Sequence, residues 1–162
     1  MCIRDRFYHL KKFFSSNHLK SLYIPLHESI MSYGIIHWGA SHHTRSISVL
    51  QNKVCRGIMN LESREPVAQI YKKMGVPNLY SLYNKRVAFF VFGNKVDFRL
   101  HDSVSVLRRG SGIVARYHNW RKSHSRIQLG YKGCEIFNNL PLECRNESRI
   151  SIFKKCLKRL DI

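Results

Sequence analysis

The spacing of apolar residues predicts a run of helices in the first half of the chain. From residue 16 to residue 93 they recur at intervals of three and four, the period of a helix with one buried face. The first helix carries its apolar stripe on Leu19, Leu22, Tyr23, Leu26 and Ile30. Pro25 lies within this stretch. Because proline lacks a backbone donor and clashes with the preceding turn, we expect a kink there or a later start.

The second helix should be amphipathic with a basic polar side. Gly34 and Gly39 separate it from the first helix. Its apolar stripe consists of Ile47, Leu50, Val54 and Ile58. Its other faces carry Arg45, Lys53 and Arg56.

Start and stop signals define two further helices. The third should begin near Pro66, whose fixed φ suits a first helical turn, and end at Gly75. Its apolar positions are Val67, Ile70, Tyr71 and Met74. Asn78 can cap the fourth helix, which ends at Gly93 and Asn94. Its apolar positions are Leu79, Leu82, Tyr83, Val87, Phe90 and Val91.

The second half of the chain has a weaker pattern until its last residues. Residues 94 to about 134 follow neither period, although short alternating pieces such as 113–115 could pair as strands. A final amphipathic helix has Ser148 as its expected N-cap. Its apolar positions are Ile150, Phe153, Leu157 and Leu160. Its exposed side carries Lys154, Lys155, Lys158 and Arg159.

These patterns predict a mainly α protein. A small helical bundle of about four helices occupies residues 7–93, an irregular basic segment occupies 94–134, and a C-terminal motif and amphipathic helix occupy 135–162.

The charge of the chain points to a polyanionic partner. There are 28 Lys and Arg residues against 10 Asp and Glu, a formal net charge of +18. Such a surface attracts phosphates. Hydrophobic residues make up 44% of the chain and aromatic residues 12%, a content that supports a folded core. No apolar run is long enough to span a bilayer, so we expect a soluble, intracellular protein without membrane contact, nuclear or cytoplasmic. The cysteines are odd in number and widely spaced, which favours buried or free thiols in a reducing compartment: Cys2, Cys55, Cys134, Cys144 and Cys156.

The acidic residues are too scattered for metal-dependent phosphoryl transfer. No two aspartates are adjacent, whereas two-metal chemistry needs carboxylates that share divalent cations. His37, His42 and His43 could bind a metal and support a metal-dependent hydrolase, but neither Cys nor acid is near them in sequence, so this is the least favoured alternative. We expect no catalytic residues, no metal and no cofactor.

An acid-free stretch is the strongest candidate for nucleic-acid contact. Between Asp102 and Glu135 cations accumulate beside aromatic residues, a combination that binds phosphates and stacks on bases. With the basic side of the second helix, the predicted nucleic-acid-binding residues are Lys53, Arg56, Arg108, Arg109, Arg116, Tyr117, Trp120, Arg121, Lys122, Arg126 and Lys132.

Several motifs, in order, resemble one protein family. The run from Leu19 to Gly39, LKSLYIPLHESIMSYGIIHWG, is followed by Leu-Gln-Asn-Lys at 50–53. Pro66 to Leu79 and the Ile-Phe-Asn-Asn-Leu-Pro segment at 136–141 follow, and then Ser148 and residues 153–158. This order resembles the region just after the catalytic domain of reverse transcriptases from non-LTR (LINE-type) retrotransposons.

The resemblance implies a thumb-like helical region that grips template-primer or target DNA. It implies a non-catalytic C-terminal fragment of an RNA-directed DNA polymerase whose partners are RNA or DNA and an upstream polymerase domain with paired aspartates. Residues 1–6, MCIRDR, fit neither the family pattern nor a helix, and we interpret them as a translated sequencing-library adapter. The alternative function is a structural or interaction module that docks on the missing polymerase domain.

Overall fold

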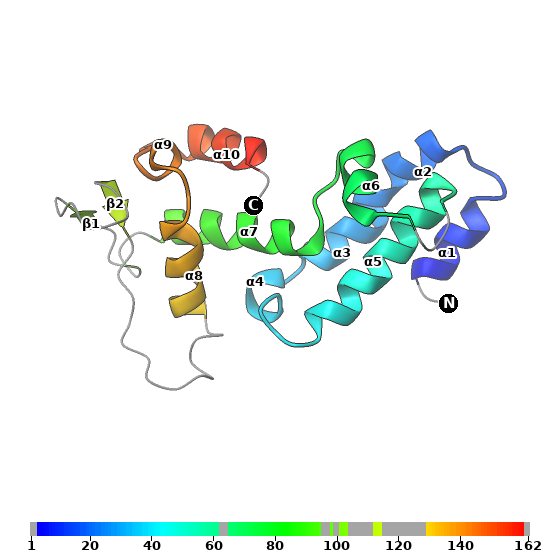
Figure 1. Cartoon of the computed structure of the whole chain (residues 1–162), viewed down its shortest axis with the longest axis horizontal. Coiled ribbons are helices and arrows are strands. Elements are labelled where there is room, and N and C mark those ends of the chain that lie inside the picture. Colours follow the sequence, from blue (N-terminus) through cyan, green and yellow to red (C-terminus); the bar gives the residue numbers. More distant parts are fainter. Residues whose placement is uncertain are drawn as a thin grey trace. The chain divides into compact units, whose positions relative to one another are not determined.

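A computed structural model describes residues 3–61, 65–94, 98, 101–103, 112–114 and 129–160 of the chain. Most of these residues are helical, so the predicted mainly α class is confirmed. The chain divides into two compact units, Met1–Leu82 and Tyr83–Ile162. The boundary lies within the long helix α7, Leu79–Gly93 (Figure 1).

The first unit is built around one central helix. Its elements before α7 are α1 (Ile3–Leu10), α2 (Ser16–Tyr23), the π-helix η1 (Ile24–Glu28), α3 (Ser29–Ser32), α4 (Ile35–Trp38), α5 (Thr44–Met59) and α6 (Val67–Met74). Helix α5 packs against α1, α2 and α6 (Figure 1). The predicted second helix is therefore the element on which these three helices assemble.

Helix α1 corrects the prediction that residues 1–6 fit no helix. Ile3 to Arg6 form its first turns, and the buried side chain of Phe7 holds the helix in place. The Phe7 ring lies 6.4 Å from the rings of Tyr23 and His27, measured between centroids. Helix α1 is too short for its apolar side to be recognised in the sequence, and it is stabilised by the packing of Phe7 against the rest of the unit.

Pro25 produces a π turn. The backbone N–H of Ser29 bonds to the carbonyl of Ile24 across η1, and α2, η1 and α3 follow one another without a break. A wider turn avoids the clash that proline causes in an α-helix and holds one extra residue. The buried stripe therefore continues from Tyr23 to His27 and Met31.

This shift makes part of the predicted apolar stripe wrong. Leu26 and Ile30 were expected to be buried, but both are exposed, and Ile30 retains 56% of its accessible surface. The predicted stripe kept a regular helical repeat beyond the kink or later start expected at Pro25, whereas the π turn displaces the buried face by one residue.

A buried glutamine joins three elements of the first unit. Gln51 on α5 is 0% exposed. Its Nε2 donates hydrogen bonds to the hydroxyl of Tyr23 (2.8 Å) and the carbonyl of Pro77 (3.0 Å). Its Oε1 accepts from the backbone N–H of Leu79 at 2.9 Å, at the start of α7. Each polar atom of this side chain is paired inside the core, as a buried amide requires.

The local signals predicted for α6 and α7 are confirmed. Gly75 ends α6 with a φ of 69°, in the left-handed region that favours glycine. Asn78 accepts a hydrogen bond from the backbone N–H of Ser81 at 2.8 Å, which satisfies a free amide of the first turn of α7. Gly93 is the last residue of that helix.

The second unit packs aromatic side chains between helices. Its elements after α7 are β1 (His101–Ser103), β2 (Gly112–Val114), α8 (Leu129–Asn138), α9 (Leu142–Arg145) and α10 (Ile150–Arg159). Phe92 and Phe153 stack with centroids 4.1 Å apart, and Phe137 lies 6.3 Å from Phe153. All three rings are buried, so the core joins α7, α8 and α10.

The segment predicted to be irregular contains regular structure at three places. Strands β1 and β2 pair antiparallel, with His101 opposite Val114 and Ser103 opposite Gly112. Helix α8 begins at Leu129, so the prediction of irregular structure is wrong for residues 129–134. Two glycines weaken the helical signal there, but Gly133 lets α8 approach α7 closely: a Cβ at Gly133 would lie 2.9 Å from Cγ2 of Val91.

The last helix begins two residues later than its expected cap. Arg149, not Ser148, occupies the N-cap position of α10, and no side chain caps it. The buried positions Phe153 and Leu157 agree with the predicted stripe, whereas Ile150 is exposed. Burial of the two central residues, rather than capping, fixes this helix.

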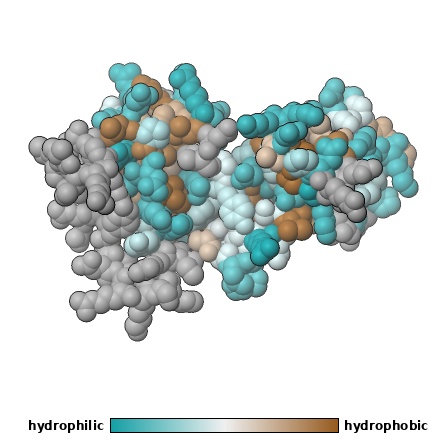
Figure 2. Space-filling model, viewed as in Figure 1, coloured by the Kyte–Doolittle hydropathy of each residue, from teal (hydrophilic) through white to brown (hydrophobic). Residues whose placement is uncertain are grey.

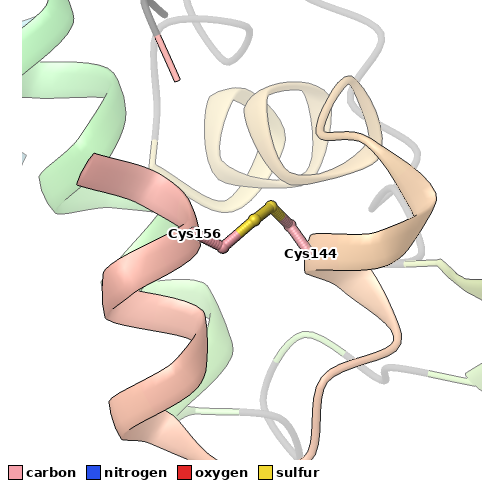
Figure 3. The surroundings of a disulfide bond; sticks show 2 residues. All are labelled: Cys144 and Cys156. Carbon is pink, nitrogen blue, oxygen red and sulfur yellow. A yellow bond between two sulfur atoms is a disulfide. The ribbon is translucent and has the colours of Figure 1, made fainter. Parts of the chain in front are cut away.

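Two cysteines form a disulfide. Cys144 on α9 and Cys156 on α10 point toward each other and are bonded, with Cα atoms 5.9 Å apart (Figure 3). The expectation that they are free thiols is wrong, because packing of α9 against α10 brings together residues twelve positions apart. Cys55 and Cys134 are buried and are not part of a disulfide, as expected.

Candidate nucleic-acid interface

Helix α5 presents the basic face predicted from the sequence. Arg45 and Lys53 are exposed and Arg56 is half-buried, and the helix contains no acidic residue. Helical spacing places them on one side of α5. Gln51, Val54 and Ile58 occupy the buried side. The core thus holds the helix while its cations remain available.

A cavity of about 520 Å³ lies beside this face, between α1 and α5. We refer to it as the α1–α5 cavity. Its lining residues are Asp5, Tyr8, Lys11, Lys53, Arg56, Gly57 and Leu61. Two of the predicted binding residues, Lys53 and Arg56, are therefore brought together with a third cation, Lys11, that was not predicted.

The guanidinium of Arg56 is held by the backbone. Its Nη2 donates a hydrogen bond to the carbonyl oxygen of Glu65 at 3.0 Å. Its Nε is buried, and no acceptor for it lies within the described part of the chain. A fixed guanidinium with donors left over is suited to an anion, because the planar group offers several N–H donors in a rigid geometry.

Helix α10 carries a second basic face, in the other unit. The residues Lys154, Lys155, Lys158 and Arg159 are exposed. They lie opposite the buried Phe153 and Leu157. In the view of Figure 2, hydrophilic residues project over α9 and α10. Because α10 contains no acid, this face concentrates positive charge without an internal ion pair.

Most of the other predicted binding residues lie outside the described residues. These are Arg108, Arg109, Arg116, Tyr117, Trp120, Arg121, Lys122 and Arg126. Lys132 is described: it lies on α8, where its Nζ is 2.6 Å from Oε2 of Glu135. This half-buried pair offsets the charge of Lys132, so we expect Lys132 to contribute less to phosphate binding than the exposed cations of α5 and α10.

The buried ionisable groups do not suggest catalysis. Burial raises the pKa of the Cys55 thiol to about 12 and that of Cys134 to about 11, so neither is a thiolate at neutral pH. Burial lowers the pKa of His27 to about 4, and its ring stacks on Tyr23 with centroids 5.0 Å apart. Such groups belong to the core.

Three histidines were considered as metal ligands: His37, His42 and His43. The rings of His42 and His43 lie 3.7 Å apart, and His37 precedes them on α4. Among the residues that the structure describes, no group of three His, Cys, Asp or Glu side chains is placed to hold a metal.

The α1 residues of the cavity were missed by the sequence analysis. Asp5, Tyr8 and Lys11 are spaced by three residues, so one side of α1 and its following turn faces the cavity. The adapter interpretation of residues 1–6 removes Asp5 from the prediction. Tyr8 and Lys11 carry no local signal of their own, because the cavity residues of α5 lie more than 40 positions later in the sequence.

Several exposed apolar side chains lie on η1, α3 and the following turn. Ile24, Leu26 and Ile30 are exposed, and Tyr33 retains 86% of its accessible surface. The π turn leaves two of them outside the core. Exposed apolar side chains that lie together can mark a contact surface.

Comparisons with protein-family models, with curated proteins and with solved structures found no match to the chain. Within the described ranges, the helices are too short or too polar to cross a membrane.

Proposed function

We propose that this chain binds nucleic acid and is the non-catalytic C-terminal fragment of a retrotransposon reverse transcriptase. The observation that carries the binding proposal is the pair of acid-free helices α5 and α10, each with exposed cations opposite a buried apolar side. A helix of this kind is held by its apolar side and offers the other to phosphates.

The assignment to a reverse transcriptase rests on the order of the sequence motifs. Several residues of these motifs have structural roles in this protein. Gln51 joins three elements, and Phe137 and Phe153 belong to the core of the second unit. In the proposal these motifs maintain a helical scaffold that presents cations to RNA or DNA, and the chemistry resides in a polymerase domain upstream.

Salt dependence of binding tests the proposal. Each phosphate contact contributes about −0.9 to the slope of log affinity against log salt on a duplex. Removing the four cations of α10 by K154A, K155A, K158A and R159A should therefore make the slope for a 20-base-pair duplex less negative by about 3 to 4. Fluorescence anisotropy between low and physiological salt measures it.

A matched pair of variants separates a specific face from net charge. K154A/K155A on α10 and K72A/K73A on α6 each remove two exposed lysines. We expect the α10 pair to weaken binding several times more than the α6 pair. Equal losses would mean that only total charge matters, and salt-independent affinity in the parent chain would overturn nucleic-acid binding altogether.

A second candidate function is docking on the upstream polymerase domain. The exposed apolar side chains of Leu26, Ile30 and Tyr33 favour it, because a contact with another domain would remove them from water. The double change I30S/Y33S should then abolish co-purification with that domain while leaving duplex affinity unchanged. Loss of duplex affinity in this variant would assign these two side chains to nucleic-acid contact instead.

A further inference from the structure

We infer that the α1–α5 cavity binds a single nucleotide through a terminal phosphate monoester. The inference rests on the proposed function and names the chemistry of one part of the interface. It concerns Tyr8, Lys11, Lys53 and Arg56, which come from two helices of the same unit.

The charge of the cavity matches a phosphate monoester. Three lining residues are cationic and one, Asp5, is acidic, so the formal net charge of the lining is +2. An internal phosphodiester of a strand carries one negative charge, whereas a phosphate monoester carries about −1.5 to −2 near pH 7. The monoester therefore neutralises the cavity more completely.

The size of the cavity matches one nucleotide. A volume of about 520 Å³ is within the ~300–1,000 Å³ range of sites that hold small molecules. A duplex instead needs an open surface or an element that enters its groove, which is about 12 Å wide on the major side. The basic faces of α5 and α10 can contact the phosphate backbone of a nucleic acid, and the cavity can admit the end of a nucleic-acid strand.

The lining supplies partners for each part of a nucleotide. Arg56 is fixed by its bond to the Glu65 carbonyl, and an anion beside it would offset part of the cost of its buried, unpaired Nε. Lys11 and Lys53 are exposed and can close on the phosphate from both sides. The ring of Tyr8, 60% exposed at the cavity, offers a face on which a base can stack.

The experiment compares single-stranded 8-mers that carry a phosphate at the 5′ end, at the 3′ end or at neither. We expect one of the phosphorylated strands to bind the parent chain about tenfold more tightly than the unphosphorylated strand, since it gains charge-assisted hydrogen bonds. K11Q/K53Q should abolish this preference, and K72Q/K73Q, which removes two exposed lysines of α6, should retain it. Y8A should weaken binding of the preferred strand and Y8F should restore it.

The outcomes separate this inference from the proposed function. Equal affinity for all three strands in the parent chain, or a preference that survives K11Q/K53Q, overturns the cavity assignment alone, provided the unphosphorylated strand still binds in a salt-dependent way. Absence of binding to any strand overturns the proposed function instead. Displacement of the preferred strand by the adenosine monophosphate that carries its phosphate at the same position, 5′ or 3′, identifies a free nucleotide as a ligand of the same site. Failure of that monophosphate to displace the strand identifies the strand end.

Discussion

Replacing Gln51 by methionine should destabilise the first unit severely. Methionine has nearly the same length but no hydrogen-bonding amide, so the change keeps the packing and removes all three bonds. The backbone N–H of Leu79, the carbonyl of Pro77 and the hydroxyl of Tyr23 then lose their partner. A buried polar group left unpaired costs about 1–3 kcal/mol, so three of them, less the added apolar burial, lower the free energy of unfolding by about 3–6 kcal/mol.

Urea denaturation followed by far-UV circular dichroism measures this loss. In thermal melts it corresponds to a fall in Tm of roughly 10 °C, at about 2–4 °C per kcal/mol for a chain of this size. Asn52→Ala is the matched control on the same helix, since it removes one part-buried bond, from the hydroxyl of Tyr71 (2.6 Å), and should cost about 1 kcal/mol. If Q51M lies within 1 kcal/mol of the parent chain, the three bonds do not hold the unit together and the reasoning is refuted.

Three further predictions concern pH, packing and redox state. The pKa of His27 is about 4 in the folded chain and 6.5 when unfolded, so the unfolded state takes up a proton first as pH falls. The free energy of unfolding should therefore decrease by about 3 kcal/mol from pH 6.5 to 4. Urea titrations at different pH values measure this decrease, and H27F should make it smaller. G133A should lower the free energy of unfolding by about 1–3 kcal/mol, because the added Cβ meets the β-branched side chain of Val91. G130A, which has open space in the same helix, should leave the free energy of unfolding unchanged or raise it by up to about 1 kcal/mol. Similar melting temperatures for the two variants would contradict the close approach of α8 to α7. Reduction of the Cys144–Cys156 disulfide, which closes a loop of twelve residues, should lower stability by about 3 kcal/mol, and the C144S/C156S variant should be insensitive to reductant in the same melts.

The sequence predicts best where the structure is decided by a few adjacent residues. Gly75 and Asn78 specify a helix end and a helix start through their own backbone and side-chain chemistry, and both act as expected. The stripe of α5 was found at Val54 and Ile58 because a regular helix repeats its buried face.

The remaining features depend on contacts between distant segments. No local signal says that Gln51 is fully buried, because its burial depends on Tyr23, Pro77 and Leu79 arriving together. The α1–α5 cavity needs two helices far apart in sequence, and the disulfide needs α9 to fold onto α10. In the candidate interface, the sequence identified Lys53 and Arg56 as cations but could not bring Lys11 beside them.

The π turn at residues 24–28 shifts the pattern of core-facing positions along the chain by one residue. Before it, the side of the helix that faces the core is set by Leu19 and Tyr23; after it, the same side is set by residues that a regular repeat would place on the surface. In an alignment to a protein with a regular helix at this point, the core positions on the two sides would agree only if one residue were skipped. An alignment of two such sequences would therefore need a one-residue gap near Pro25, rather than a substitution, to keep their core positions matched.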